Sequence, residues 1–241
     1  MDRKGENMSK PIAVIIGVGD GLSASLARAL APDYALVLAA RSEGKMAALA
    51  EETGAATTIM NASDPAAMAA LFAGLGAAPR VAIYNPSARV RGPLVELDPD
   101  SVREAVEVTA YGAFLMGQAA AKRMQNAEID DGRRGTILFT GASAGVKGFA
   151  RSAPFAMGKF AQRGLAQSMA RELHPKGIHV VWINIDGGIR NASRPERMDP
   201  AGSPDSMLDP DAIAAAYIQL IDQPRSAWSD ELTLRPWVET F

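Results

Sequence analysis

The apolar run Pro11-Ile-Ala-Val-Ile-Ile16 leads directly into the glycine-rich turn Gly17-Val-Gly-Asp-Gly-Leu-Ser23. Such a run is typical of a buried strand, and residues 22–31 have the period and composition of a helix. Glycines at this place allow a tight turn and close approach of a pyrophosphate to the helix N-terminus. Because position 22 is Leu, the G-x-G-x-x-G spacing is incomplete, and an ordinary turn is the alternative. We favour dinucleotide binding, with these candidate residues: Gly17, Gly19, Gly21 and Leu22.

Strand-like and helix-like segments alternate along the rest of the chain. The predicted strands are 11–16, 34–40, 57–60, 81–84, 135–140, 179–185 and 231–234. The predicted helices are 22–31, 43–53, 65–75, 99–125, 154–173 and 210–222, with a break near the start of 99–125 left open. Apolar strands separated by helices indicate parallel pairing with both sheet faces covered. Right-handed crossovers then predict an α/β fold: a single-domain, doubly wound, Rossmann-like parallel sheet in a three-layer sandwich.

Composition excludes several classes of function. The 241 residues include 25 Lys and Arg against 27 Asp and Glu, a formal net charge of −2, so we expect no nucleic-acid or anionic-membrane partner. The absence of Cys excludes disulfides, cysteine zinc sites and thiol nucleophiles. Two His are too few for a typical zinc site, so no metal is predicted. No apolar run approaches the roughly 18–20 residues of a membrane span.

The chain divides into a short leader and one domain. Residues 1–9 are polar and lack the apolar stretch of a signal peptide, so we predict a flexible leader and a cytoplasmic protein. Residues 10–241 form the predicted domain. The segment at about 190–208 is rich in Pro, Gly, Ser and Met without a clear period, and loops of that length in a compact domain are often lids.

Arg41 and Ser42 follow the second predicted strand, where an acidic residue would hold the ribose 2′-hydroxyl of NAD. No acidic residue occurs there before Glu43. Arg41 instead has the chemistry to pair with a 2′-phosphate, which favours NADP(H) over NAD(H). A solvated Arg at a strand end is the alternative.

Ligands in such sheets bind outside the carboxyl ends of the strands, so the residues after the other strands are also candidates. Ala62 would lie at the edge of the adenine, and Asn85 would pack by a ribose. Gly187 and Ile189 follow the sixth strand, where close backbone approach suits a flat ring. Each of these segments also has a simple interpretation as a turn. The two remaining candidates are Ser143, after the fifth strand, and Lys159, on the next helix, which would face the ribose.

From about Lys10 onward, the order of these elements and motifs resembles the short-chain dehydrogenase/reductase superfamily. The glycine motif of that family appears here as Ile16-Gly-Val-Gly-Asp-Gly-Leu-Ser23, with two of its three glycines kept. Its N-N-A-G motif appears as Tyr84-Asn-Pro-Ser87, and its Y-x-x-x-K motif as Phe155-Ala-Met-Gly-Lys159. The resemblance implies a nicotinamide cofactor and an oxidoreductase activity.

The resemblance also assigns catalytic positions, and this chain departs from several of them. It implies a Tyr as proton donor or acceptor, and that position holds Phe155, which has no proton to give. Thr109 takes the position of the active-site Asn. Ser143 is the preferred candidate for the Ser that polarises the substrate oxygen, although one residue's difference in spacing would put Ala142 there. Lys159 is kept. A divergent subgroup of the superfamily, similar to this chain, shares Phe at the Tyr position together with Lys.

Two hypotheses follow. The first is an NADP(H)-dependent oxidoreductase acting on an unidentified carbonyl, enone or alcohol with a non-standard active site. The second is an NADP(H)-binding pseudoenzyme that serves as a sensor or partner subunit. Phe155 favours the second, and the retained pocket residues agree with both. The resemblance further implies a homodimer or homotetramer. The sequence identifies neither the substrate nor the direction of the reaction.

Overall fold

A computed structural model describes residues 10–130 and 132–239, so the predicted leader lies outside the described residues. Their strands form one seven-stranded, wholly parallel sheet in the order β3-β2-β1-β4-β5-β6-β7. The strands are β1 (Ile12–Ile16), β2 (Ala35–Ala40), β3 (Ala56–Ile59), β4 (Val81–Tyr84), β5 (Gly135–Thr140), β6 (Ile178–Ile185) and β7 (Glu231–Leu234). The predicted doubly wound parallel sheet is confirmed.

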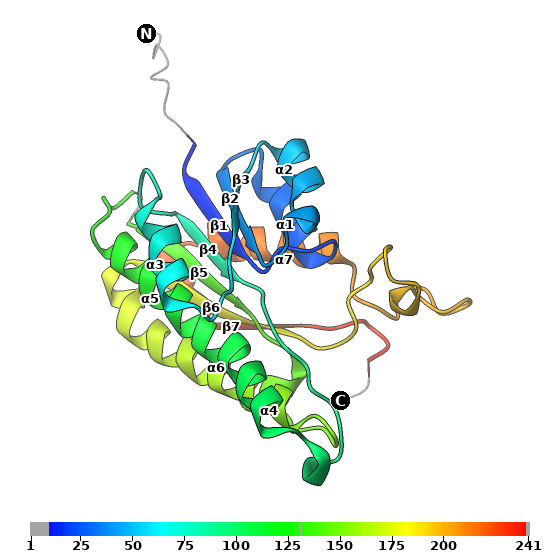
Figure 1. Cartoon of the computed structure of the whole chain (residues 1–241). Coiled ribbons are helices and arrows are strands. Elements are labelled where there is room, and N and C mark those ends of the chain that lie inside the picture. Colours follow the sequence, from blue (N-terminus) through cyan, green and yellow to red (C-terminus); the bar gives the residue numbers. More distant parts are fainter. Residues whose placement is uncertain (1–9, 131, 240–241) are drawn as a thin grey trace.

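Helices cover both faces of the sheet (Figure 1). One layer contains α1 (Leu22–Leu30), α2 (Ala47–Thr53) and α7 (Pro210–Asp222). The other contains α3 (Pro65–Ala73), α4 (Pro99–Val106), α5 (Gly112–Gln125) and α6 (Ala153–Leu173). The described chain is therefore the three-layer sandwich that the sequence predicts.

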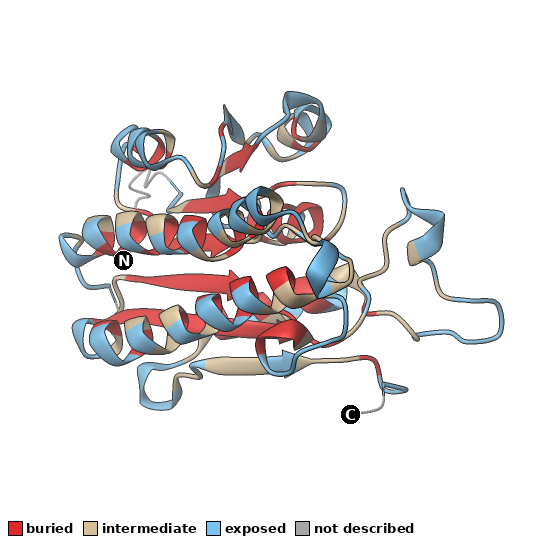
Figure 2. Cartoon of the chain, turned by 60° about the horizontal axis from the view of Figure 1, so that its bottom comes forward, coloured by how far each residue is buried: buried red, intermediate tan, exposed pale blue. Residues whose placement is uncertain are grey.

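Two apolar cores lie on the two faces of the sheet, and the strands contribute side chains to both of them. Along β1, Ala13 and Ile15 pack into the core under α1 and α7, whereas Val14 and Ile16 pack into the core under α3, α5 and α6. Successive side chains of a strand point to opposite faces, which is why an uninterrupted apolar run is needed here. Figure 2 shows the buried strands between helices whose outer surfaces are exposed.

Three helices begin with the same dipeptide, Asp followed by Pro. Asp64, Asp98 and Asp209 each accept backbone N–H groups of the first turn of α3, α4 and α7, and a proline follows each of them. The carboxylate satisfies amide groups that have no partner within the helix, and proline lacks the N–H that would be left over. These caps fix the starts of the three helices.

The predicted helix 99–125 is interrupted, at its middle rather than near its start. A π-helical turn, Glu107–Tyr111, separates α4 from α5. The Tyr84 hydroxyl donates to the carbonyl of Val108 at 2.5 Å, and the backbone N–H of Ala88 donates to the Thr109 hydroxyl at 3.1 Å. Contacts from the last residue of β4 and from the segment after it thus satisfy backbone and side-chain groups at the distorted turn.

The segment between β6 and α7 projects away from the sheet (Figure 1). Its base is closed by a parallel bridge between Ile189 and Leu208, and it contains one 3₁₀ turn, Pro195–Arg197. Of the described residues, no helix has the length and apolar character needed to cross a membrane.

Candidate active site

A cavity of about 1250 Å³ opens at the carboxyl ends of the central strands. This volume exceeds the ~300–1,000 Å³ of a typical small-molecule pocket, as expected for a dinucleotide and a second ligand together. The structure brings nearly all candidate residues onto its wall: Gly17, Gly19, Gly21, Leu22, Arg41, Ser42, Ala62, Asn85, Ser143, Phe155, Lys159, Gly187 and Ile189. Thr109 does not line it.

The glycine-rich turn forms a backbone cradle below this cavity. Gly17 has a φ of 86°, and a Cβ there would lie 2.7 Å from Pro86, whereas a Cβ on Gly19 would meet nothing within 4 Å. No side chain of the described residues caps the start of α1, so its first amide groups stay available to an anion. The cradle fits the pyrophosphate of a dinucleotide.

Ser23, at the position of the third glycine in the resemblance, holds the turn together. Its hydroxyl donates to the carbonyl of Gly17 at 2.9 Å and accepts from the side-chain amide of Asn85 at 2.5 Å. Asn85 therefore ties the end of β4 to the turn after β1. The replacement of glycine by serine is accommodated by a hydrogen bond in the interior of the turn.

Arg41 and Ser42 lie at the end of β2, and both are exposed on the cavity wall. In the described part of the chain, Arg41 forms no ion pair. An exposed guanidinium without a carboxylate partner is available to a phosphate group.

Lys159 lies on α6, one turn after Phe155, and is buried. Its ammonium donates to the carbonyl of Thr140 at 2.5 Å and to Oε1 of Gln162 at 3.2 Å. Burial, and second the positive charge of Arg89, lower the pKa of Lys159 to about 7. An ammonium has three donors, so one remains for a ligand in the cavity.

Ser143 begins a 3₁₀ turn after β5 and lines the cavity. In the described residues, its hydroxyl makes no hydrogen bond, whereas the neighbouring Ala142 is buried against Phe155. Thr109 is fully buried; its hydroxyl accepts from Ala88 and its carbonyl accepts from Gln162. Its predicted catalytic role stays a prediction, and the observed contacts are structural.

Sequence reasoning missed Arg89 and Arg91, which also line the cavity. The guanidinium carbon of Arg89 lies 4.3 Å from the ring centroid of Phe155. The pKa of Arg89 is lowered mainly by burial and also by the positive charges of Arg197 and Arg91. The sequence signal that could have identified them is their spacing, since Arg89 and Arg91 alternate with Val90 shortly after the predicted strand 81–84.

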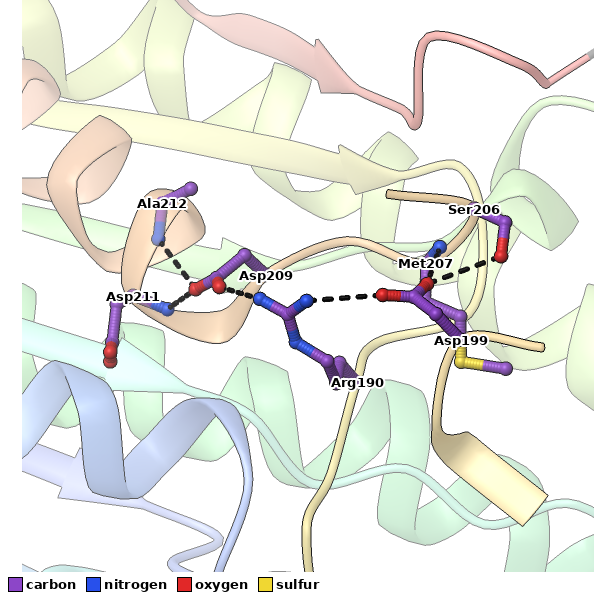
Figure 3. Close-up of polar contacts among 7 residues, drawn as sticks. All are labelled: Arg190, Asp199, Ser206, Met207, Asp209, Asp211 and Ala212. Atoms are coloured by element: carbon purple, nitrogen blue, oxygen red, sulfur yellow. Dashed lines mark hydrogen bonds and ion pairs between the residues drawn. The ribbon is translucent and has the colours of Figure 1, made fainter. Parts of the chain in front are cut away.

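The base of the predicted lid is held by ion pairs (Figure 3). Arg190 pairs with Asp199 at 3.1 Å and also with Asp209, the residue that caps α7. The backbone N–H of Met207 and the Ser206 hydroxyl donate to Asp199, and these bonds, with Arg190, lower its pKa. Arg190 is therefore neutralised, although it lines the cavity.

The lid segment also reaches the glycine-rich turn. The Ser193 hydroxyl donates to Oδ1 of Asn191 at 2.8 Å and lies 3.4 Å from the carboxylate of Asp20. A Cβ on Gly21 would lie 3.3 Å from the side-chain nitrogen of Asn191. The segment therefore contacts the glycine-rich turn at Asp20 and Gly21.

Comparisons with known proteins agree with this geometry. The sequence profile of the family described as short chain dehydrogenase matches residues 11–194. Trans-4-hydroxycyclohexanecarboxylate dehydrogenase of Sinomonas cyclohexanicum is 30% identical over 195 residues, which cover 75% of this chain and 73% of that protein. The chain belongs to the short-chain dehydrogenase family.

Solved structures show the same fold. A short-chain dehydrogenase from Rhodopseudomonas palustris aligns with a TM-score of 0.78 and 31% identity, covering 94% of this chain and 99% of that one. A metagenomic short-chain oxidoreductase, solved in complex with NADP, aligns with a TM-score of 0.79 and 24% identity, covering 97% and 100%. The predicted superfamily is confirmed.

Proposed function

We propose that this chain is an oxidoreductase that uses NADP(H) to reduce a carbonyl group, or oxidise an alcohol, of a small molecule. One observation carries the proposal: a single cavity is lined by the glycine-rich turn, by Arg41, and by the group of Ser143, Phe155 and Lys159. Membership of the family supports an oxidoreductase. The NADP complex of the metagenomic relative supports the choice of cofactor.

Each part of the cofactor has candidate residues in the cavity. Arg41 and Ser42 would bind the 2′-phosphate, and the backbone from Gly17 through Gly19 and Gly21 to Leu22 would bind the pyrophosphate. The remaining candidates are Ala62 at the adenine, Asn85 and Lys159 at the riboses, and Gly187 and Ile189 at the nicotinamide. Ser193 and Asn191 support a role of residues 190–208 as a lid over the pyrophosphate.

The cofactor supplies or accepts the hydride, and the protein orients the reactants and handles the proton. The Ser143 hydroxyl, which has no hydrogen bond to the described residues, would polarise the substrate oxygen. The Phe155 ring has no acidic proton, so it cannot act as a general acid. General acid catalysis typically accelerates a reaction by about 10²–10⁴-fold. An activated acceptor such as a conjugated enone depends less on a strong acid than a plain ketone does. Phe155 therefore favours such an acceptor, with Ser143 or a water on Lys159 supplying the proton.

A second function, an NADP(H)-binding pseudoenzyme that acts as a sensor or partner subunit, is favoured by Phe155 itself. The divergent subgroup with Phe at the Tyr position fits either function. The two differ in turnover and not in cofactor binding. A panel of enones and ketones, assayed with NADPH, distinguishes them.

Calorimetric titration with NADPH, NADH, NADP⁺ and NAD⁺ tests the cofactor. Micromolar affinity for NADPH, weaker affinity for NADH, and NADPH affinity that falls about 10- to 100-fold on Arg41→Ala are the expected results. If none of the four nucleotides binds, the oxidoreductase and the pseudoenzyme proposals both fail.

We also propose a homodimer or homotetramer. Four large apolar side chains are exposed on the outer faces of the π-turn, α5 and α6: Tyr111, Phe114, Met157 and Phe160. Tyr111 and Phe114 stack on each other, with 6.2 Å between their ring centroids, and exposed apolar side chains grouped in this way support an interaction surface. Light scattering that gave the mass of one chain, 25.3 kDa, would contradict the assembly.

A further inference from the structure

We propose that the substrate carries an oxyanion group, a carboxylate or a phosphate, and that Arg89, Arg91 and Arg197 bind it beside the reacting carbonyl or alcohol. The proposal rests on the function above for the reaction, but the anion site is defined by its own residues.

The cavity wall is strongly basic in a chain whose formal net charge is −2. Eight of the lining residues are basic: Arg41, Arg89, Arg91, Arg151, Lys159, Arg190, Arg194 and Arg197. Asp20 is the single acidic residue among the described residues of the wall, and it lies in the glycine-rich turn, next to the Ser193 hydroxyl. A cleft lined by one sign of charge concentrates ligands of the opposite sign.

Three of these cations line the cavity and have no ion-pair partner among the described residues. In residues 10–130 and 132–239, Arg89, Arg91 and Arg197 form no ion pair, in contrast to Arg190. All three line the same cavity, and the charges of Arg197 and Arg91 add to burial in lowering the pKa of Arg89. Unpaired cations repel one another, and an oxyanion between them would relieve that repulsion while accepting several hydrogen bonds.

Two of the three arginines lie at the substrate end of the cavity. Arg89 and Arg91 follow β4, and the N–H of Gly92 donates to the carbonyl of Arg151, just before α6. Arg89 itself stacks on Phe155, one helical turn from Lys159. Arg41, the candidate for the cofactor phosphate, comes instead from the end of β2. The anionic group of the substrate would therefore lie near the reacting carbon, as in a short oxo acid or hydroxy acid.

The test compares charged probes with neutral counterparts of nearly the same shape. Glyoxylate, phenylglyoxylate and levulinate are paired with their amides, and dihydroxyacetone phosphate with dihydroxyacetone. Binding is measured by calorimetry to wild type, Arg89→Gln, Arg91→Gln and Arg197→Gln, with and without NADPH. Arg103→Gln is the matched control, because it removes the same charge from the exposed surface of α4. Thermal unfolding checks that each variant is folded.

We expect at least one charged probe to bind wild type more tightly than its neutral partner. Arg89→Gln, Arg91→Gln and Arg197→Gln should each weaken the binding of that probe about 10- to 100-fold, the usual effect of losing a charged hydrogen bond. Arg103→Gln should not, and NADPH affinity should stay unchanged in all variants. The proposal is overturned if no charged probe is preferred, if the variants of the three arginines keep the preference, or if they weaken NADPH instead. Arginine-dependent probe binding without NADPH binding would support the anion site and refute the proposed cofactor.

Discussion

The guanidinium of Arg89 lies over the ring of Phe155, with 4.3 Å between its central carbon and the ring centroid. The quadrupole of an aromatic ring attracts a cation to its face. Phe155 therefore holds a fixed positive charge in the cavity, and that charge is the second cause of the lowered pKa of Lys159. A ring without a hydroxyl group thus still influences the electrostatics of the site.

Replacing Phe155 by Tyr should create or raise ketone reduction by about 10²-fold or more, because it adds the missing general acid near Ser143 and Lys159. Initial rates with NADPH and a carbonyl panel check this. Phe155→Leu is the control, since it removes the ring without adding a proton donor. Equal rates for the Tyr and Leu variants would show that the missing phenol is not what limits turnover.

Replacing Arg41 by Ala should weaken the binding of NADPH about 10- to 100-fold and leave the affinity for NADH nearly unchanged, because only NADPH carries the 2′-phosphate. Calorimetry with both nucleotides gives the ratio. Arg28→Ala, which removes an exposed arginine paired with Glu52 on α2, is the control. An equal loss of affinity for both nucleotides would contradict a specific contact between Arg41 and the 2′-phosphate.

Gly17→Ala and Gly19→Ala should separate folding from binding. Ala at position 17 must adopt a φ of 86° and meets Pro86, so it should destabilise the fold by about 1–3 kcal/mol. Ala at position 19 has open space and should leave stability nearly unchanged while weakening NADPH, whose pyrophosphate must approach that backbone. Urea unfolding and calorimetry measure the two effects. Equal stability of the two variants would disprove the strained position.

Lys159 should make stability rise with pH. Its pKa of about 7 in the fold lies below the ordinary 10.5, so the unfolded chain binds more protons between those values. Without cofactor, unfolding free energy should therefore rise from pH 7 toward 10.5, by up to about 1.4 kcal/mol per unit relative to Lys159→Met. Parallel curves for the two proteins would show that the lysine is not desolvated.

His179 should limit stability in acid. It is fully buried on β6, stacks on Trp228 and donates from Nε2 to the carbonyl of Ser229 at 2.7 Å. Burial lowers its pKa to about 4, with a smaller contribution from His174. Because the unfolded value is about 6.5, stability should fall as pH drops from 6.5 to 4. In His179→Phe, the free energy of unfolding should lack this decrease between pH 6.5 and 4, as measured by unfolding curves.

Much of the fold was predictable from residues that are neighbours in sequence. The runs at 81–84 and 135–140 are strands with the predicted bounds, because a strand buried on both faces needs mostly apolar residues. The run at 231–234 also has the predicted bounds, although it is a partly exposed edge strand. A break in the helix 99–125 was left open, and its position at 107–111 could not be predicted, since the π-helical turn is contacted by Tyr84 and Ala88, which are distant in sequence. Helical periodicity contains no information about such partners.

The sequence by itself determined the order of elements, the glycine turn after β1, the arginine after β2 and the absence of a phenol at position 155. These are local patterns, and parallel topology sends the strand ends to one edge of the sheet. Only the tertiary structure decided that Thr109 lies behind the cavity wall, that Arg190 is neutralised by Asp199 and Asp209, and that Arg89 stacks on Phe155. Charge and hydrogen-bonding partners are set by through-space distance, which residue order does not specify.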